Sequence, residues 1–66
     1  MKAQYDAETD ALFLRFSADE IVETEEVRPG MMLDFNDAGK IVAIELLDAS
    51  QKVSGDPSEF AGFEVA

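Results

Sequence analysis

Apolar residues in this chain come in short runs with a period of two, and turn-forming residues separate the runs. Within ALFLRF at residues 11–16, one set of alternate positions is entirely apolar and the other is half apolar. Such alternation predicts a β-strand with one buried face. Further runs of this kind lie at residues 2–5, 21–27, 31–35 and 40–47. Together they predict a mainly β fold, an antiparallel β-meander of four to five strands.

Two of these runs predict their own place in the sheet. Residues 40–47 (KIVAIELL) are apolar on both sets of alternate positions, which predicts a central strand covered on both sides. Residues 21–27 (IVETEEV) are rich in glutamate, and charged side chains are typical of an edge strand protected against aggregation.

The turns between the runs have recognisable chemistry. DAETD at 6–10 predicts a hairpin turn capped by its own side chains. Pro29 followed by Gly30 is the favoured pair at the centre of a type II turn. Asn36 to Gly39 (NDAG) predicts a hairpin built from a type I turn and a left-handed glycine.

The C-terminal part carries weaker signals. Residues 46–53 predict a short helix, which would make the fold α+β. We therefore expect one small β-meander domain over residues 1–53. Residues 54–66 form a tail that is loosely ordered or docked through Phe60 and Phe63, which are three positions apart.

The length of the chain limits its core. A domain of 66 residues buries only about 60 % of the surface that its unfolded chain exposes. The sequence has no Cys and no His, so neither a disulfide nor a zinc site with thiolate or imidazole ligands supplements this core. Self-association, as a homodimer, is the expected supplement.

Charge narrows the range of partners. Fifteen acidic and five basic residues give a net charge of -10, which repels nucleic-acid phosphates and anionic lipid headgroups. The same charge favours a basic protein partner. No apolar run approaches the roughly 20 residues that span a bilayer, and residues 1–10 lack the apolar run of a signal peptide, so a cytoplasmic protein is expected.

One segment partly matches a calcium-binding loop. In DFNDAGKIVAIE at 34–45, Asp34, Asn36 and Glu45 occupy the first, third and twelfth positions of the loop, and Gly39 the sixth. Ala38 stands where a ligating side chain is expected, and hairpin chemistry alone accounts for Asn36 and Gly39. A divalent-cation site is therefore the alternative, and no metal or other cofactor is the favoured expectation. A second acidic set, Asp6, Glu8 and Asp10, lacks a Gly at the bend and fits a polar turn.

Nothing in the sequence predicts catalysis. Glu25 and Glu26 are consecutive on a strand and point to opposite faces, so they do not meet across a substrate. There is no His or Cys, no nucleophile elbow and no phosphate-binding glycine loop. Glu45, inside the most apolar strand, requires a partner, and a structural ion pair with Arg15 or Arg28 is expected.

The remaining candidates form an interaction surface. The expected members are acidic residues of the edge strand and apolar residues nearby or in the tail, namely Glu23, Glu25, Glu26, Met32, Phe60 and Phe63. This favours a non-enzymatic interaction module that self-associates or neutralises a basic partner, in the manner of an antitoxin. The alternative is a protein that binds a divalent cation or a small ligand through the 34–45 hairpin.

Four motifs in order, YD, DALFLRF, EEVRPGMMLDFN and GKIVAIELLDAS, resemble a small bacterial family catalogued as domain of unknown function 2283. The resemblance covers residues 1–52. It implies a small, mainly antiparallel β protein with a short helix near its end. It implies no catalytic residues, because none are established for the family.

Overall fold

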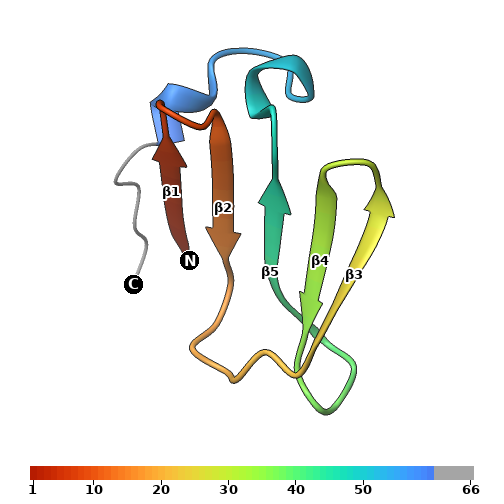
Figure 1. The fold of residues 1–66 in the computed structure, drawn as a ribbon. Helices are drawn as coiled ribbons and strands as arrows, with labels where there is room; N and C mark the ends of the chain where they lie inside the picture. Colours follow the sequence, from red (N-terminus) through yellow and green to blue (C-terminus); the bar gives the residue numbers. More distant parts are fainter. Residues whose placement is uncertain (61–66) are drawn as a thin grey trace.

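Five antiparallel strands form one sheet in the order β1-β2-β5-β4-β3 (Figure 1). The structure is a computed structural model that describes residues 1–60. The strands are β1 (Lys2–Asp6), β2 (Ala11–Arg15), β3 (Glu23–Arg28), β4 (Met31–Phe35) and β5 (Ile41–Leu46), followed by two 3-10 turns, η1 (Ala49–Gln51) and η2 (Pro57–Phe60). The predicted mainly β, antiparallel fold is confirmed.

The strand that comes last in the chain lies in the middle of the sheet. β5 pairs with β2 on one side and with β4 on the other. The meander is continuous over β3, β4 and β5, while residues 16–22 carry the chain from β2 along the lower end of the sheet to the far edge (Figure 1). The central position predicted for the strand at 40–47 and the edge position predicted for the strand at 21–27 are both confirmed.

The three predicted turns are present, and in the first of them the Glu8 N–H donates to Asp6 Oδ1 at 3.0 Å. Gly30 follows Pro29 with φ +75°, the value that the third residue of a type II turn requires. Gly39 has φ +77°, and its N–H donates to the carbonyl of Asn36 at 3.0 Å, which closes a turn ending in a left-handed glycine. These two hairpins set the register of β4 against its neighbours on both sides.

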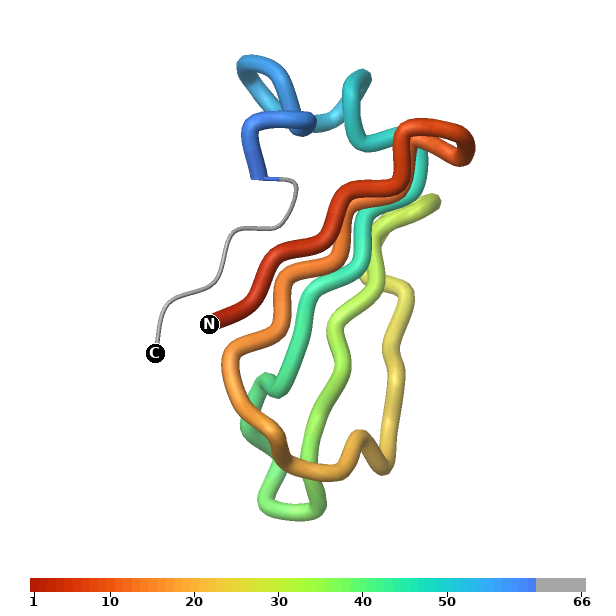
Figure 2. The backbone as a smooth tube through the Cα atoms, turned by 90° about the vertical axis from the view of Figure 1, so that its left-hand side faces the viewer, coloured from red at the N-terminus to blue at the C-terminus, as the bar shows by residue number. Residues whose placement is uncertain are grey.

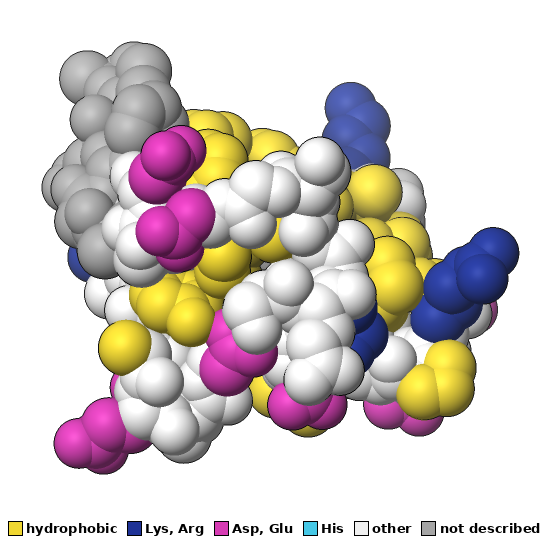
Figure 3. Space-filling view, turned by 90° about the horizontal axis from the view of Figure 1, so that it is seen from above, with side chains coloured by type: hydrophobic (Ala, Val, Ile, Leu, Met, Phe, Trp, Pro, Cys, Tyr) yellow, Lys and Arg dark blue, Asp and Glu magenta, His cyan; other side chains and the backbone are white. Residues whose placement is uncertain are grey.

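The two faces of the sheet differ in composition. On the core face, Leu12 lies opposite Leu46 and Leu14 opposite Ile44, and Met31 lies opposite Leu46 on the other side of β5. This apolar stripe continues to Ala49 and Val53, which pack against it from the turns beyond β5. Figure 3 looks down on that end of the molecule, and apolar side chains show between the polar groups of the turns. We call the other face of the sheet the polar face, because it carries Glu45, Asp34 and Thr24.

Asp10 ties the β1-β2 hairpin to the η1 turn that follows β5. Its backbone is left-handed (φ 54°), and its carboxylate accepts hydrogen bonds from the N–H and hydroxyl of Ser50 and from the hydroxyl of Tyr5. The bond between Ser50 Oγ and Asp10 Oδ2 is 2.6 Å long. Because charged acceptors hold such bonds strongly, η1 is fixed over the β1-β2 turn.

Residues 46–53 are less helical than predicted. The expected short helix near residues 46–53 is a single 3-10 turn at Ala49–Gln51, because β5 continues to Leu46 and Asp48 takes a left-handed conformation (φ 52°) before the turn. η2 packs against β1, with Pro57 buried. Figure 2, which looks along the sheet from the side of β1, shows η1 and η2 at one end of the twisted strands. Phe63 lies outside the described residues.

Candidate functional site

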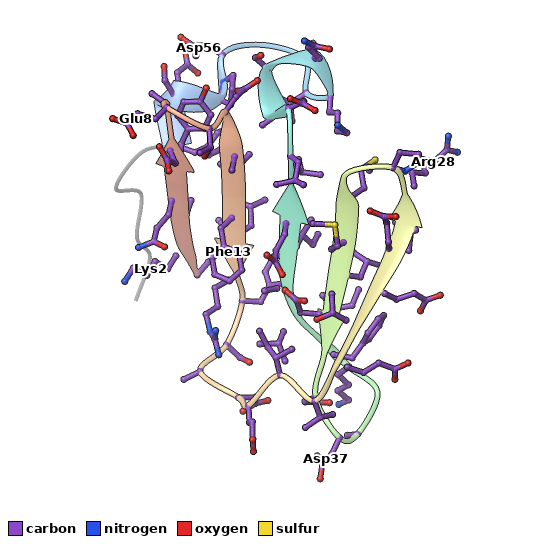
Figure 4. The ribbon with its side chains drawn as sticks, in the orientation of Figure 1. Lys2, Glu8, Phe13, Arg28, Asp37 and Asp56 are labelled. Atoms are coloured by element: carbon purple, nitrogen blue, oxygen red, sulfur yellow. The ribbon has the colours of Figure 1, made fainter. Side chains whose placement is uncertain are left out.

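β3 is an exposed strand at one edge of the sheet. All six of its residues, ETEEVR, are exposed. It pairs with β4 alone, so its other side faces solvent. Three of the predicted interaction residues, Glu23, Glu25 and Glu26, lie on this strand, and Arg28 marks its upper end (Figure 4).

The hydrogen-bond ladder shows which backbone groups of β3 face outward. Leu47 N–H donates to the Gly30 carbonyl at 2.8 Å, and β4 and β5 pair in register from there, with Met32 opposite Glu45. Bonded pairs alternate in an antiparallel ladder, so Met32 and Asp34 bond toward β5, while Met31, Leu33 and Phe35 bond toward β3. The bond from Val22 N–H to the Phe35 carbonyl, 2.9 Å, agrees with this.

It follows that alternate residues of β3 have different backbone environments. Glu23 lies opposite Phe35 and Glu25 opposite Leu33, so their N–H and C=O groups are used inside the sheet. Thr24 and Glu26 turn theirs outward. The register then shifts between Glu26 and Arg28, a β-bulge at Val27 that ends the regular edge. The open edge is therefore short and acidic.

The polar face behind β3 contains a buried carboxylate. Asp34 is completely buried, and its Oδ1 accepts a 2.6 Å hydrogen bond from the hydroxyl of Thr24, which lies directly opposite on β3. The other oxygen, Oδ2, has no hydrogen-bond partner within residues 1–60. An unpaired buried carboxylate oxygen is costly, so this position needs a donor.

Glu45 is the neighbouring group that supplies a donor in its protonated form. It lies on β5 and is half-buried, two residue pairs along the ladder from Asp34 and on the same face of the sheet. A side-chain hydrogen bond with Asp34, burial, and the charge of Asp34 together raise the pKa of Glu45 above its ordinary value. When Glu45 is protonated, its hydroxyl donates to the Asp34 carboxylate; when the pH lies above the raised pKa of Glu45, the two carboxylates repel one another.

The ion pair predicted for Glu45 is replaced by this carboxyl pair. Arg15 donates instead to two backbone carbonyls of the following loop, Nε to Ser17 and Nη2 to Asp19, both at 2.7 Å. Arg28 lies at the outer end of β3, two strands away from Glu45 (Figure 4). The predicted ion pair was wrong because the sequence alone does not show that Asp34 of β4 lies beside Glu45 of β5.

The structure brings together two of the three residues predicted as metal ligands. Asp34 and Glu45 are neighbours, but Asn36 lies in the hairpin turn, where its side-chain oxygen accepts hydrogen bonds from the N–H groups of Ala38 and Lys40 at 3.0 and 2.9 Å. In the part of the chain that the structure describes, no three acidic side chains gather as a metal site requires. Asn36 therefore acts as a turn residue.

Acidic groups continue below β3 toward this hairpin. A shallow pocket of about 300 Å³ is lined by Asp19, Glu20, Val22, Asn36 and Asp37. Asn36 Nδ2 donates to Asp19 Oδ2 at 3.1 Å, which joins the crossover loop to the hairpin whose tip carries Asp37 (Figure 4). The negative surface thus extends from β3 onto the lower end of the sheet.

The other two predicted interaction residues that the structure describes, Met32 and Phe60, lie far apart. Met32 is half-buried on the polar face, opposite Glu26 on one side and Glu45 on the other. Phe60, at the end of η2, is 40 % exposed and lies on the side of β1, at the opposite edge of the sheet from β3. Of these two residues, Met32 is therefore close to the acidic edge and Phe60 is not. No helix among residues 1–60 is long and apolar enough to cross a membrane.

These features define a small antiparallel β protein with an open acidic edge and a carboxyl pair behind it. The model of the family described as "Protein of unknown function (DUF2283)" matches residues 2–50, so the chain belongs to that family. The match covers all five strands and ends within η1. Searches among curated proteins and among solved structures gave no match.

Proposed function

We propose that this protein is a non-enzymatic interaction module that binds a basic polypeptide at the β3 edge, in the manner of an antitoxin that neutralises a cationic partner. The observation that carries the proposal is the edge itself, a strand with every residue exposed and one side unpaired. An extended segment adds to such an edge through backbone hydrogen bonds, which is a common mode of peptide recognition.

Charge supports a basic partner over other classes. The chain carries a net charge of -10, and three of the six residues of β3 are glutamates. Negative potential of this kind accelerates encounter with a cationic partner and opposes nucleic acid. The acidic pocket formed by Asp19, Glu20 and Asp37 extends the same field beyond the strand.

The test is size-exclusion chromatography with light scattering on untagged protein recovered from its native cell extract. We expect co-elution with a basic polypeptide at a fixed stoichiometry. The double variant Glu25→Lys, Glu26→Lys, expressed in the same cells, should elute alone while keeping the β spectrum by circular dichroism. Elution of the native protein alone, as a monomer or as a homodimer, would overturn the proposal.

A further inference from the structure

We infer that the β3 edge reads a short sequence pattern, with cations at the first, second and fourth positions of an extended segment that adds antiparallel to β3. This inference rests on the proposed function and makes it specific. It follows from which backbone groups of β3 point outward and on which face each glutamate lies.

The backbone sets the register. Only Thr24 and Glu26 offer outward N–H and C=O groups before the bulge at Val27, as the ladder through Gly30, Leu47 and Phe35 requires. An incoming strand therefore forms its bonded pairs with Thr24 and Glu26 and its non-bonded pairs with Glu23 and Glu25. Four consecutive residues of the partner lie opposite residues 26, 25, 24 and 23, in that order.

Each of these four positions meets a defined side chain. The first lies opposite Glu26 on the polar face, and the second lies opposite Glu25 on the core face. The third meets Thr24, whose hydroxyl is already donated to Asp34, so it needs no charge. The fourth meets Glu23. Because opposite charges in cross-strand pairs are favourable and like charges are not, the pattern is cation, cation, any residue, cation.

The same geometry disfavours a second copy of this chain at the edge. If two β3 strands pair antiparallel through the outward groups of Thr24 or Glu26, each resulting register places a glutamate of one copy opposite a glutamate of the other. The net charge of -10 on each copy adds long-range repulsion. A basic segment from another protein satisfies both the backbone groups and the charge.

A peptide containing Lys-Lys-Val-Lys between Gly-Ser flanks tests the pattern, with Lys-Val-Lys-Lys of identical composition as its control. The primary measurement is amide hydrogen exchange of the full chain by NMR. We expect the peptide to slow exchange at Thr24 and Glu26, while Glu23 and Glu25 are already protected in its absence. The control peptide, which places Val opposite Glu25 and Lys opposite Thr24, should bind about two- to fivefold more weakly.

Two variants separate the backbone from the charge. Glu26→Gln keeps the outward N–H and should weaken binding a few-fold with protection at Thr24 retained. Glu26→Pro removes that N–H without breaking a bond to β4 and should abolish protection at Thr24. If Glu26→Pro fails to fold, a charge swap replaces it. The variant Glu25→Lys and the peptide Lys-Glu-Val-Lys, whose second residue lies opposite position 25, should each bind weakly to the unchanged partner and should regain affinity when combined.

Two results would overturn the inference. One is peptide binding with Thr24 and Glu26 exchanging as fast as before, since charge alone would then account for it. The other is equal affinity for the two peptide orders. After either result, the proposed function still holds if the native protein co-elutes with a basic polypeptide. If the native protein does not co-elute with one, the proposed function itself is refuted.

Discussion

Replacing Asp34 by asparagine should stabilise the protein near neutral pH. The wild-type side chain is completely buried, and one of its oxygens has no partner within residues 1–60. In Asp34→Asn, Oδ1 still accepts the hydroxyl of Thr24, and the new amide N–H groups donate to the Glu45 carboxylate. The variant therefore removes an unpaired buried acceptor and the repulsion between two carboxylates in one step.

The magnitude follows from the cost of a buried group left unpaired, about 1–3 kcal/mol. Glu45 is only half-buried, so solvent screens part of the repulsion, and we expect the lower part of that range, about 1–2 kcal/mol. A chain of 66 residues has a total stability of about 3–10 kcal/mol. In a domain of this size each kcal/mol moves the melting temperature by about 4–8 °C.

The effect should depend on pH with a defined sign. The pKa of Glu45 is raised in the folded protein by its hydrogen bond to Asp34, by burial and by the charge of Asp34. The stabilisation that its proton provides is thus fully present below the ordinary pKa of 4.5 and is lost as the pH rises through the folded value. The advantage of Asp34→Asn should be small at pH 4 and should grow with pH through this window.

Urea unfolding at pH 4 and pH 7, monitored by circular dichroism, measures both the stabilisation by Asp34→Asn and its change with pH. Glu45→Gln is the matched control, and it should also stabilise at pH 7. The double variant should gain less than the sum of the two, because each change removes the same repulsion. An Asp34→Asn protein that is less stable than wild type at pH 7 would show that the buried charge is held by interactions other than those argued above.

Four further predictions concern the core, the turns, the Asp10 contacts and metal binding. Leu12→Ala should cost about 2–5 kcal/mol and leave much of the protein unfolded at 25 °C in a thermal melt, because Leu12 is only 3 % exposed in the apolar cluster. Gly30→Ala should destabilise slightly more than Gly39→Ala in urea unfolding. Both add about 1–2 kcal/mol of left-handed backbone strain, but a Cβ at Gly30 also displaces the flexible Lys52 side chain from its hydrogen bond to the Leu47 carbonyl, whereas a Cβ at Gly39 has no atom within 4 Å. The pKa of Asp10 is lowered chiefly by the hydrogen bond from Ser50 and then by that from Tyr5, so in Ser50→Ala it should rise toward 3.8 in an NMR titration. As the pH falls below 3.8, the wild-type protein should lose more stability than this variant. Millimolar calcium should leave the melting temperature unchanged, because Asn36 is held in its turn by Ala38 and Lys40, and a rise would revive the metal-binding alternative.

Local chemistry made much of the fold predictable. Proline before glycine, and asparagine three residues before glycine, specify their turns through backbone conformations that few other residues adopt, and both glycines have the expected positive φ. The apolar pattern of residues 40–47 likewise predicted the central position of β5, but the predicted cover on both sides is incomplete, because Ile41 and Leu47 are exposed.

The contacts that the sequence did not predict join distant segments. Asp10 and Ser50 are 40 residues apart, and no periodicity or spacing relates them. Glu45 lies near Asp34 because β4 and β5 are neighbours in a particular register. The alternation within one strand shows which of its residues share a face, but it does not show which residues of another strand lie beside them. The acidic character of the edge could be predicted from the sequence. That the backbone groups of Thr24 and Glu26 point outward could be inferred only from the hydrogen-bond ladder of the structure.

The position of β5 also has a consequence for the order in which the chain folds. β1-β2 and β3-β4 are two separate hairpins until residues 41–46 insert between them, and a lone two-stranded hairpin is marginally stable at best in water. During synthesis, therefore, most of the sheet has to wait until β5 has left the ribosome, and the acidic edge of β3 is exposed on an unsupported hairpin in the meantime. Like charges on the β3 glutamates oppose edge-to-edge pairing of such hairpins, so the charges that would select a partner in the folded protein also disfavour aggregation of the unfinished chain.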